Sequence, residues 1–398
     1  MNQIFSIARL PRIEFGAGAI RKIPAILDRY GKRLLIVSGG QSLQATPQWA
    51  WLSETLQAQK FDYEVIRVSG EPSPELVDEA VASFRGREFD VVLGIGGGSV
   101  LDAAKAIAGL LKPGNSVMDH LEGVGPELPY VGPTTPFVAV PTTAGTGSEA
   151  TKNAVLSTLS TQGKDGFKKS FRDEQLVPEY AVVDPDLLAT CPQPLIAANG
   201  MDAFTQLLES YVSSKANPLT DALAWSGMEA ARDGLLAWYE GGEGAVAGRE
   251  KMAYAALLSG VTLAQVGLGS VHGLAAPLGA FHAVPHGMAC GILLQAATRV
   301  NIEVLEARDP AHPVLVKYAR VGRMFARKVH VDDAAARATL LQTLAHWSES
   351  MSLPRLGGFG VGSADLAHIV VHCRGSSMKT NPVELSDAEA ESILATCL

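Results

Sequence analysis

Four side chains in the second half of the chain could together hold one divalent cation. Asp202 opens a strongly helical stretch, and Gln206 follows one turn later on the same face. His272 and His286 come further along, each among small and apolar residues. One carboxylate, two imidazoles and an amide oxygen suit Fe(II), Zn(II), Mn(II) or Co(II), and not a soft copper site. Such an ion would polarise an alcohol or carbonyl oxygen.

The histidines are also open to a simpler interpretation. A single histidine in apolar surroundings is more often a core residue whose hydrogen bonds are satisfied, so the metal hypothesis depends on several donors occurring together. His282 is a rival ligand, because it stands at i, i+4 spacing from His286. Pro285 favours a new helix that begins at His286, in which case the two histidines need not share a face.

A glycine-rich turn, GIGGGS, follows a hydrophobic run in the first half of the chain. Gly97 and Gly98 would let the backbone approach a phosphate, and the following helix would offer free N–H groups. Ser99 and Asp102 have the spacing of a capping box, so a purely structural role at the helix start is the alternative. The turn departs from the G-x-G-x-x-G pattern and does not follow the first strand.

Hydroxylated residues gather in a second loop, PTTAGTGSEAT. Thr142, Thr143 and Ser148 could bind a ribose, an amide or a phosphate, whereas in a plain turn they would bond to the local backbone. Both loops follow predicted strands, and open α/β sheets bind cofactors at the carboxyl ends of their strands. Together the loops favour a nucleotide cofactor.

The first half of the chain alternates strand-like and helix-like patterns. Strands are predicted over 33–38, 62–69, 89–96, 135–141 and 179–185, and helices over 74–86 and 99–111. This alternation predicts parallel β–α–β units. Further along, long alanine- and leucine-rich segments predict helices alone, over 195–213, 218–240, 246–269, 287–304, 311–328, 332–351, 363–373 and 386–396. We therefore expect a Rossmann-like α/β dinucleotide-binding domain over 1–188 and an all-helical metal and substrate domain over 189–398.

Length and composition agree with two soluble domains. The chain has 398 residues, 47% of them hydrophobic, which is too long for one ordinary core. A formal charge of −8 argues against nucleic-acid or anionic-membrane partners. The four cysteines, Cys290 among them, form no C-x-x-C pair, so each is interpreted as a small buried hydrophobe in a reducing compartment. Without a signal-peptide core or a membrane-length apolar run, a cytoplasmic protein is expected.

These motifs resemble those of the iron-containing (group III) alcohol dehydrogenase family, nearly from end to end. The resemblance is carried by PRIEFGAG (11–18), GIGGGSVLDAAKAIA (94–108), PTTAGTGSEAT (141–151), VVDPDLL (182–188), NGMDAFTQLLESY (199–211), GSVHGLAAPLGAFHAVPHGMACGILL (269–294) and NP (381–382). It implies NAD(P)-dependent interconversion of an alcohol with an aldehyde or ketone. It also implies an active site in the cleft between the two domains and a homo-oligomer, dimer or larger.

In this resemblance Asp202, His272 and His286 match three of the family's metal ligands. Fe(II) is then the expected ion, with Zn(II) as the alternative, and both histidines would be catalytic through the ion they hold. The family usually has histidine at the position of Gln206. A glutamine oxygen is neutral and a weaker donor, so metal affinity should fall, or three side chains and water should hold the ion.

A second departure is Ala276, where the family often has a histidine that contacts the nicotinamide or relays a proton. His282 could take over that catalytic role. The loss of an imidazole at Gln206 favours one alternative, a metal-independent reductase of the maleylacetate reductase type. A glycerol-dehydrogenase-like enzyme with zinc on one aspartate and two histidines is a second alternative, and a non-catalytic nucleotide-binding protein is a third.

The resemblance also implies a set of cofactor-binding residues. Lys168 matches a family lysine that stands ten residues before a proline, and Lys169 competes for that role. After the first strand many NAD-preferring relatives carry an acid that repels a 2′-phosphate, and the segment 38–42 carries none, so NADP should at least be tolerated. The candidate cofactor residues are Ser38, Gly39, Gly40, Ser42, Gly97, Gly98, Ser99, Asp102, Thr142, Thr143, Ser148 and Lys168.

Overall fold

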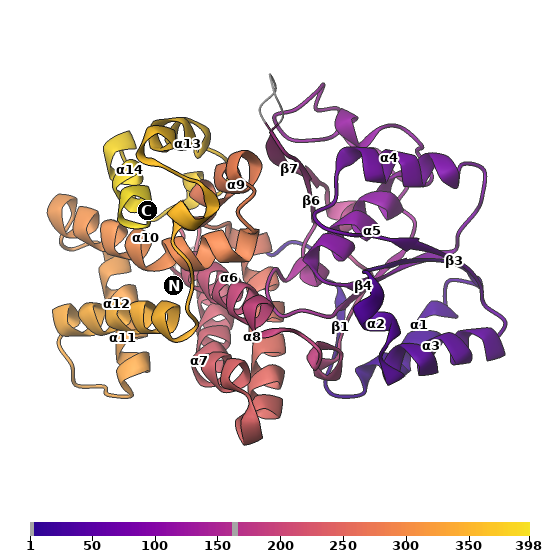
Figure 1. The fold of residues 1–398 in the computed structure, drawn as a ribbon, viewed down its shortest axis with the longest axis horizontal. Helices are drawn as coiled ribbons and strands as arrows, with labels where there is room; N and C mark the ends of the chain where they lie inside the picture. Colours follow the sequence, from indigo (N-terminus) through magenta and orange to yellow (C-terminus); the bar gives the residue numbers. More distant parts are fainter. Residues whose placement is uncertain (1–3, 161–165) are drawn as a thin grey trace. The chain divides into compact units, whose positions relative to one another are not determined.

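The computed structural model describes residues 4–160 and 166–398, and the chain divides into two compact units (Figure 1). The first unit takes in Ile7–Thr158 and Gly166–Pro192, and the second takes in Gln193–Leu398 together with residues 4–6 and 159–160. The domain boundary expected after residue 188 stays a prediction.

The first unit is built on a sheet of six strands in the order β1-β8-β5-β4-β2-β3, and every neighbouring pair is parallel. The strands are β1 (Arg12–Phe15), β2 (Arg33–Ser38), β3 (Asp62–Arg67), β4 (Val91–Gly96), β5 (Phe137–Pro141) and β8 (Tyr180–Val183). The predicted parallel α/β sheet is confirmed. Every residue of β4 and β5 is buried, as expected for central strands of a sheet that is covered on both faces.

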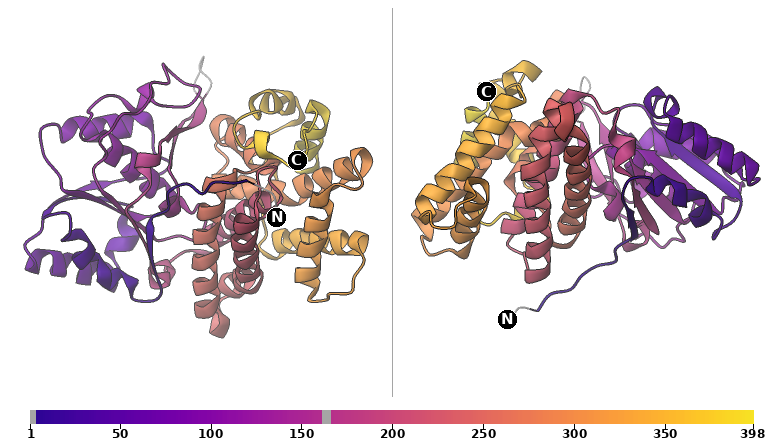
Figure 2. Two further views of the ribbon diagram at one scale, coloured as in Figure 1. Left: turned by 180° about the vertical axis from the view of Figure 1, so that it is seen from behind. Right: turned by 90° about the horizontal axis from the view of Figure 1, so that it is seen from below.

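Helices cover both faces of this sheet. They are α1 (Ile23–Leu27), α2 (Gln41–Gln44), α3 (Pro47–Ala58), α4 (Pro74–Ser83) and α5 (Gly98–Leu110), and short 3₁₀ turns occur at η1 (Ala19–Lys22), η2 (Val117–Asp119), η3 (Ser148–Ala150), η4 (Glu174–Leu176) and η5 (Pro185–Leu188). In Figures 1 and 2, α4 and α5 lie on one face, and α1 and α3 lie on the other. Two helix starts are set by local chemistry, because Thr46 and Ser73 each accept a backbone N–H and precede a proline.

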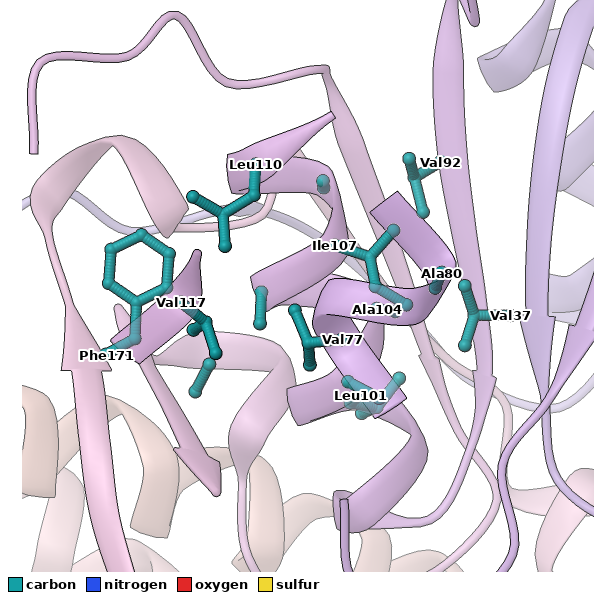
Figure 3. Close-up of a cluster of buried hydrophobic side chains, with 14 of the residues drawn as sticks. Val37, Val77, Ala80, Val92, Leu101, Ala104, Ile107, Leu110, Val117 and Phe171 are labelled. Carbon is teal, nitrogen blue, oxygen red and sulfur yellow. The ribbon is translucent and has the colours of Figure 1, made fainter. Parts of the chain in front are cut away.

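A continuous hydrophobic cluster holds α4 and α5 on the sheet (Figure 3). Val77 of α4 and Ile107 of α5 belong to it, together with Val37 of β2 and Val92 of β4. All four of these side chains are fully buried. Because α5 begins directly after β4, this packing fixes the position of the glycine-rich turn between them.

An antiparallel hairpin that the sequence did not predict joins this unit. It consists of β6 (Asn153–Thr158) and β7 (Phe167–Arg172). Its residues are mostly half-buried and polar, and Ala154, Leu156 and Phe171 supply its buried apolar contacts. So few apolar positions leave a weak alternating pattern, which is why the hairpin escaped prediction.

The second unit is helical throughout its described residues, as predicted. Its helices are α6 (Gln193–Val212), α7 (Pro218–Glu240), α8 (Ala245–Val266), α9 (Ser270–His282), α10 (His286–Arg308), α11 (Pro313–Ala326), α12 (Asp333–Ser350), α13 (Leu366–His372) and α14 (Asp387–Thr396), with 3₁₀ turns η6 (Gly242–Gly244), η7 (Leu356–Phe359), η8 (Ser363–Asp365) and η9 (Met378–Thr380). Helix α6 is central, since α7, α8 and α10 all pack on it. From Ile196 to Val212 every residue of α6 except Asn199 is buried.

Helix α10 is also a core helix. By length and mean hydropathy it could span a membrane, but 72% of its apolar window is buried within the protein. This degree of burial is that of an interior helix in a globular unit.

Two glycines let α10 approach α6 closely. A Cβ atom on Gly287 would lie 2.6 Å from the carbonyl oxygen of Ala198, and one on Gly291 would lie 3.1 Å from Cβ of Met201. Any side chain at these positions would push the two helices apart. Because Asp202 directly follows Met201, this close contact also brings the start of α10 to Asp202.

We predict that Gly287→Ala destabilises the protein, although alanine is intrinsically the better helix former by about 1 kcal/mol. The expected cost is about 1–3 kcal/mol, because the added methyl group overpacks a closed helix contact. Gly244→Ala is the control, since its Cβ would make an ordinary 3.7 Å contact with Ala237. Urea midpoints measure both variants, and equal midpoints for the two would contradict the close packing of α6 and α10.

Candidate functional site

Four potential metal ligands from three helices of the second unit meet around Asp202. Asp202 lies inside α6 and is 1% exposed, and its Oδ1 lies 3.3 Å from Nε2 of His272 and 3.8 Å from Nε2 of His286. His272 comes from the first turn of α9, and His286 is the first residue of α10. Cys290, one turn later in α10, completes the group, and the four ligand atoms all lie within 4.8 Å of one another.

The donor set fits a divalent cation. Oδ2 of Asp202 is buried and has no hydrogen-bond partner among the described residues. A buried carboxylate oxygen without a partner is energetically costly, and coordination to a cation would satisfy it. A carboxylate with two imidazoles is a borderline set that suits Fe(II) or Zn(II).

Glu209 fixes the orientation of His272. Nδ1 of His272 donates to Oε2 of Glu209 at 2.6 Å, and the backbone N–H of Val271 donates to Oε1 at 2.7 Å. With its Nδ1–H bonded to Glu209, His272 turns Nε2 toward Asp202, where this nitrogen can hold either a proton or a metal ion. The sequence analysis missed Glu209, although its i, i+7 spacing from Asp202 on one face of α6 was a usable signal.

The electrostatics of this group favour an added positive charge. Burial opposes ionisation of Asp202, but His286 and His272 hold the pKa of its carboxyl below the usual range. Burial likewise opposes protonation of His272, yet Cys290 and the two neighbouring carboxylates raise the pKa of this imidazole well above its usual range. Burial raises the pKa of the Cys290 thiol to about 12. The site therefore attracts either a proton or a metal ion.

Gln206 and His282 are the two other residues that the sequence suggested for the metal centre. Gln206 is buried one turn after Asp202, and its Oε1 accepts a 2.6 Å hydrogen bond from Ser259. His282 ends α9, and Ala283 then takes a left-handed conformation before α10 begins at His286, so the predicted new helix is confirmed. His282 lies outside the group of four, and the proposed roles of Gln206 and His282 stay predictions.

On the first unit, the glycine-rich turn leads into a helix with a free N-terminus. The N-cap of α5 is Gly97, and no described side chain caps this end. The capping-box alternative is therefore wrong, because Ser99 lies within the helix and Asp102 instead accepts a 2.6 Å hydrogen bond from Ser148. The first N–H groups of α5 are left for a ligand or solvent, which suits an anionic group.

The two predicted cofactor loops lie side by side. The N–H of Thr142 donates to the carbonyl of Gly96 at 2.9 Å, where β4 and β5 are neighbours. A Cβ on Gly98 would lie 2.6 Å from the side chain of Thr146, and one on Gly97 would lie 3.3 Å from Thr143. Glycine is required in this turn because the second loop occupies the space that a side chain would need.

A buried lysine ties the second loop to α5. Nζ of Lys105, on α5, donates to the carbonyl of Ser148 at 2.8 Å and to Oγ1 of Thr151 at 2.9 Å, and it lies 3.9 Å from Oδ1 of Asp102. Burial lowers the pKa of Lys105 to about 8, although Asp102 and Glu149 oppose this shift. The sequence analysis missed Lys105, which stands out as the single basic residue of α5.

The remaining cofactor candidates lie near the same edge of the sheet or on the hairpin. β2 ends at Ser38, whose buried Oγ has no hydrogen-bond partner among the described residues, and Gly39, Gly40 and the exposed Ser42 follow it. Lys168 lies on β7 and forms a 2.6 Å ion pair with Glu71. Candidate residues thus lie at the carboxyl ends of three neighbouring strands, β2, β4 and β5.

Comparison with known proteins identifies the family. Residues 11–185 match the family described as "Iron-containing alcohol dehydrogenase", and residues 196–398 match "Fe-containing alcohol dehydrogenase family, C-terminal". The chain belongs to the iron-containing alcohol dehydrogenase family. It is therefore an oxidoreductase of the alcohol dehydrogenase type, and the resemblance seen in the sequence is confirmed.

Relatives in this family align along most of the chain. The chain is 32% identical to lactaldehyde reductase of Escherichia coli, over 81% of this chain and 83% of that protein. It is 29% identical to the NAD-dependent methanol dehydrogenase of Bacillus methanolicus, over 86% of each. The crystal structure of a 1,3-propanediol oxidoreductase matches with a TM-score of 0.85 and 27% identity, over all of both chains.

We predict that Glu209→Gln weakens metal binding by about 10–100-fold, because His272 loses the anionic partner that orients it. Competition with a chelating dye measures the affinity. Glu303→Gln, on the exposed side of α10, is the matched control and should bind metal like the wild type. Unchanged affinity in the Glu209 variant would show that this carboxylate does not support the site.

Proposed function

We propose that this chain transfers a hydride between a nicotinamide cofactor and a small alcohol or aldehyde, with a divalent metal ion held by Asp202, His272 and His286. The observation that carries the proposal is the buried Oδ2 of Asp202, which has no hydrogen-bond partner among the described residues and stands beside two imidazoles. Relatives named for methanol, lactaldehyde and 1,3-propanediol support a short, hydroxylated substrate.

Each residue of the metal centre has a definite part in the proposal. A bound divalent ion would polarise the substrate oxygen and stabilise an alkoxide. Asp202 supplies the negative charge of the centre, and Glu209 keeps the proton of His272 on Nδ1 so that Nε2 stays a donor. A bound nicotinamide would accept the hydride of the substrate C–H bond in the oxidising direction, and the hydroxyl proton would leave to solvent.

The first unit would bind the cofactor. The N-terminus of α5 has no side-chain cap among the described residues and would receive the pyrophosphate, with the backbone of Gly97 and Gly98 close to it. The hydroxyl of Ser38, buried without a hydrogen-bond partner in the described structure, is placed to meet a polar group of the cofactor. Thr142 and Thr143, in the loop beside the turn, would add hydrogen bonds.

Two of the three alternatives fit the structure less well. A reductase without metal would leave the Asp202 carboxylate buried with an unsatisfied oxygen. A non-catalytic protein would have no need for the Glu209 contact that orients His272. A homo-oligomer, a cytoplasmic location and an active site between the domains stay predictions.

We predict that Asp202→Ala abolishes metal binding and lowers alcohol oxidation by at least about a hundredfold, because metal polarisation contributes several kcal/mol. Fluorescence of bound reduced cofactor should be unchanged, since Asp202 belongs to the helical unit. Elemental analysis, steady-state kinetics and fluorescence test this, with Asp309→Asn at the exposed end of α10 as the control.

Two results would contradict the proposal and favour one of the alternatives. Full activity in metal-free wild-type protein would identify a metal-independent reductase. Absence of hydride transfer across a panel of alcohols and aldehydes, despite bound cofactor and metal, would identify a non-catalytic protein.

We also predict that NADP supports turnover, because residues 38–42 contain no acidic side chain. Gly39 has room for one, since an added Cβ would meet only Val100 at 3.6 Å. Gly39→Asp should lower kcat/KM for NADP by about tenfold or more relative to NAD through repulsion of the 2′-phosphate. Gly39→Asn, which adds the same bulk without charge, should leave the ratio unchanged. A strong preference of the wild type for NAD would refute NADP tolerance.

A further inference from the structure

We propose that Cys290 is a metal ligand in this chain and fills the coordination position that the neutral Gln206 leaves weak. The inference rests on the proposed metal centre and adds a thiolate to it. It replaces the interpretation of Cys290 as a small buried hydrophobe that the sequence alone supported.

The distances from the two imidazoles to Cys290 and Asp202 are close to the edges of a coordination tetrahedron. Sγ of Cys290 lies 3.6 Å from Nε2 of His272 and 3.9 Å from Nε2 of His286. With metal bonds of roughly 2.0–2.1 Å to nitrogen or oxygen and about 2.3 Å to sulfur, a tetrahedral site has S···N edges of about 3.6 Å and N···O edges of about 3.3 Å. The shortest S···N distance and the 3.3 Å between His272 and Asp202 match these edges. The two longer distances belong to His286 and exceed the ideal by about half an ångström or less.

The helix geometry gives Cys290 this position. His286 and Cys290 are an i, i+4 pair at the start of α10, so their side chains share one face. The adjacent Gly291 presses against Met201 of α6, which holds that face of α10 beside Asp202. Cys290 is 0% exposed, so a ligand thiolate there would be shielded from solvent.

Gln206 competes less well for the same role. Its Oε1 already accepts the hydroxyl hydrogen of Ser259 at 2.6 Å, which uses one lone pair of a neutral donor. A thiolate is the stronger donor because it carries a full negative charge.

Coordination by Cys290 has a defined chemistry. As the metal–sulfur bond forms, the S–H bond breaks and its proton leaves to solvent, while no electron is transferred. A thiolate beside a carboxylate and two imidazoles shifts the preference toward Zn(II) and away from harder ions such as Mn(II). Zinc can expand to five-coordination, which leaves a place for the substrate oxygen.

The test uses the full-length protein, freed of metal with a chelator and reloaded with Co(II) or Zn(II). The wild type loaded with Co(II) should show a thiolate-to-cobalt charge-transfer band in the near ultraviolet. Cys290→Ser should lose the band and bind Zn(II) at least about tenfold more weakly, the loss that even outer-sphere changes produce. Cys373→Ser removes another buried thiol, and Gln206→Met removes the competing amide, and both should keep the band.

X-ray absorption at the zinc edge of the wild type makes the test independent of how the variants fold. One sulfur at about 2.3 Å from zinc is expected. A shell of nitrogen and oxygen alone, or a charge-transfer band that survives in Cys290→Ser, would overturn the role of Cys290 and leave the metal centre intact. Failure of the wild type to take up any metal would overturn the proposed centre and this inference together.

Discussion

The buried carboxylate of Asp202 is the constraint around which the helical unit is arranged. An anionic group inside a packed bundle is unfavourable unless positive charge or hydrogen bonds compensate it. Here the compensation comes from His272 of α9 and His286 of α10, and a close helix contact at Gly287 and Gly291 brings α10 to α6. One oxygen of Asp202 still has no hydrogen-bond partner in the described structure, and a cation is the partner that this geometry suits.

The buried positive charge of the first unit is compensated in a different way. Lys105 is fully buried, yet its ammonium group donates to carbonyl and hydroxyl oxygens of the second loop and lies near Asp102. All three of its protons can thus be used inside the protein. The contrast separates a structural charge, which ties the second of the two predicted cofactor loops to α5, from a charge that is left open for a ligand.

Strong local patterns made most of the fold predictable. β4 is a buried apolar run and α5 is a largely buried, alanine-rich segment, and their predicted ranges were close to those observed. The β6–β7 hairpin was missed because its polar, half-buried residues carry little periodic signal. Helix α9 was missed for two reasons. It is buried almost all round and so shows no polar face, and it contains Pro277, which usually ends a helix.

The residues of the candidate site also fall into those that the sequence revealed and those that only the structure revealed. Residue type and motif were enough to single out Asp202, His272 and His286, because several potential metal ligands occur together in motifs of one family. The roles of Glu209, Lys105 and Cys290 became clear only from the atoms that packing places beside them. Sequence periodicity acts within one element and settled the elements, and the motifs settled the family. Contacts of a few ångströms between different helices exist only after folding, and these decided which donors share one centre.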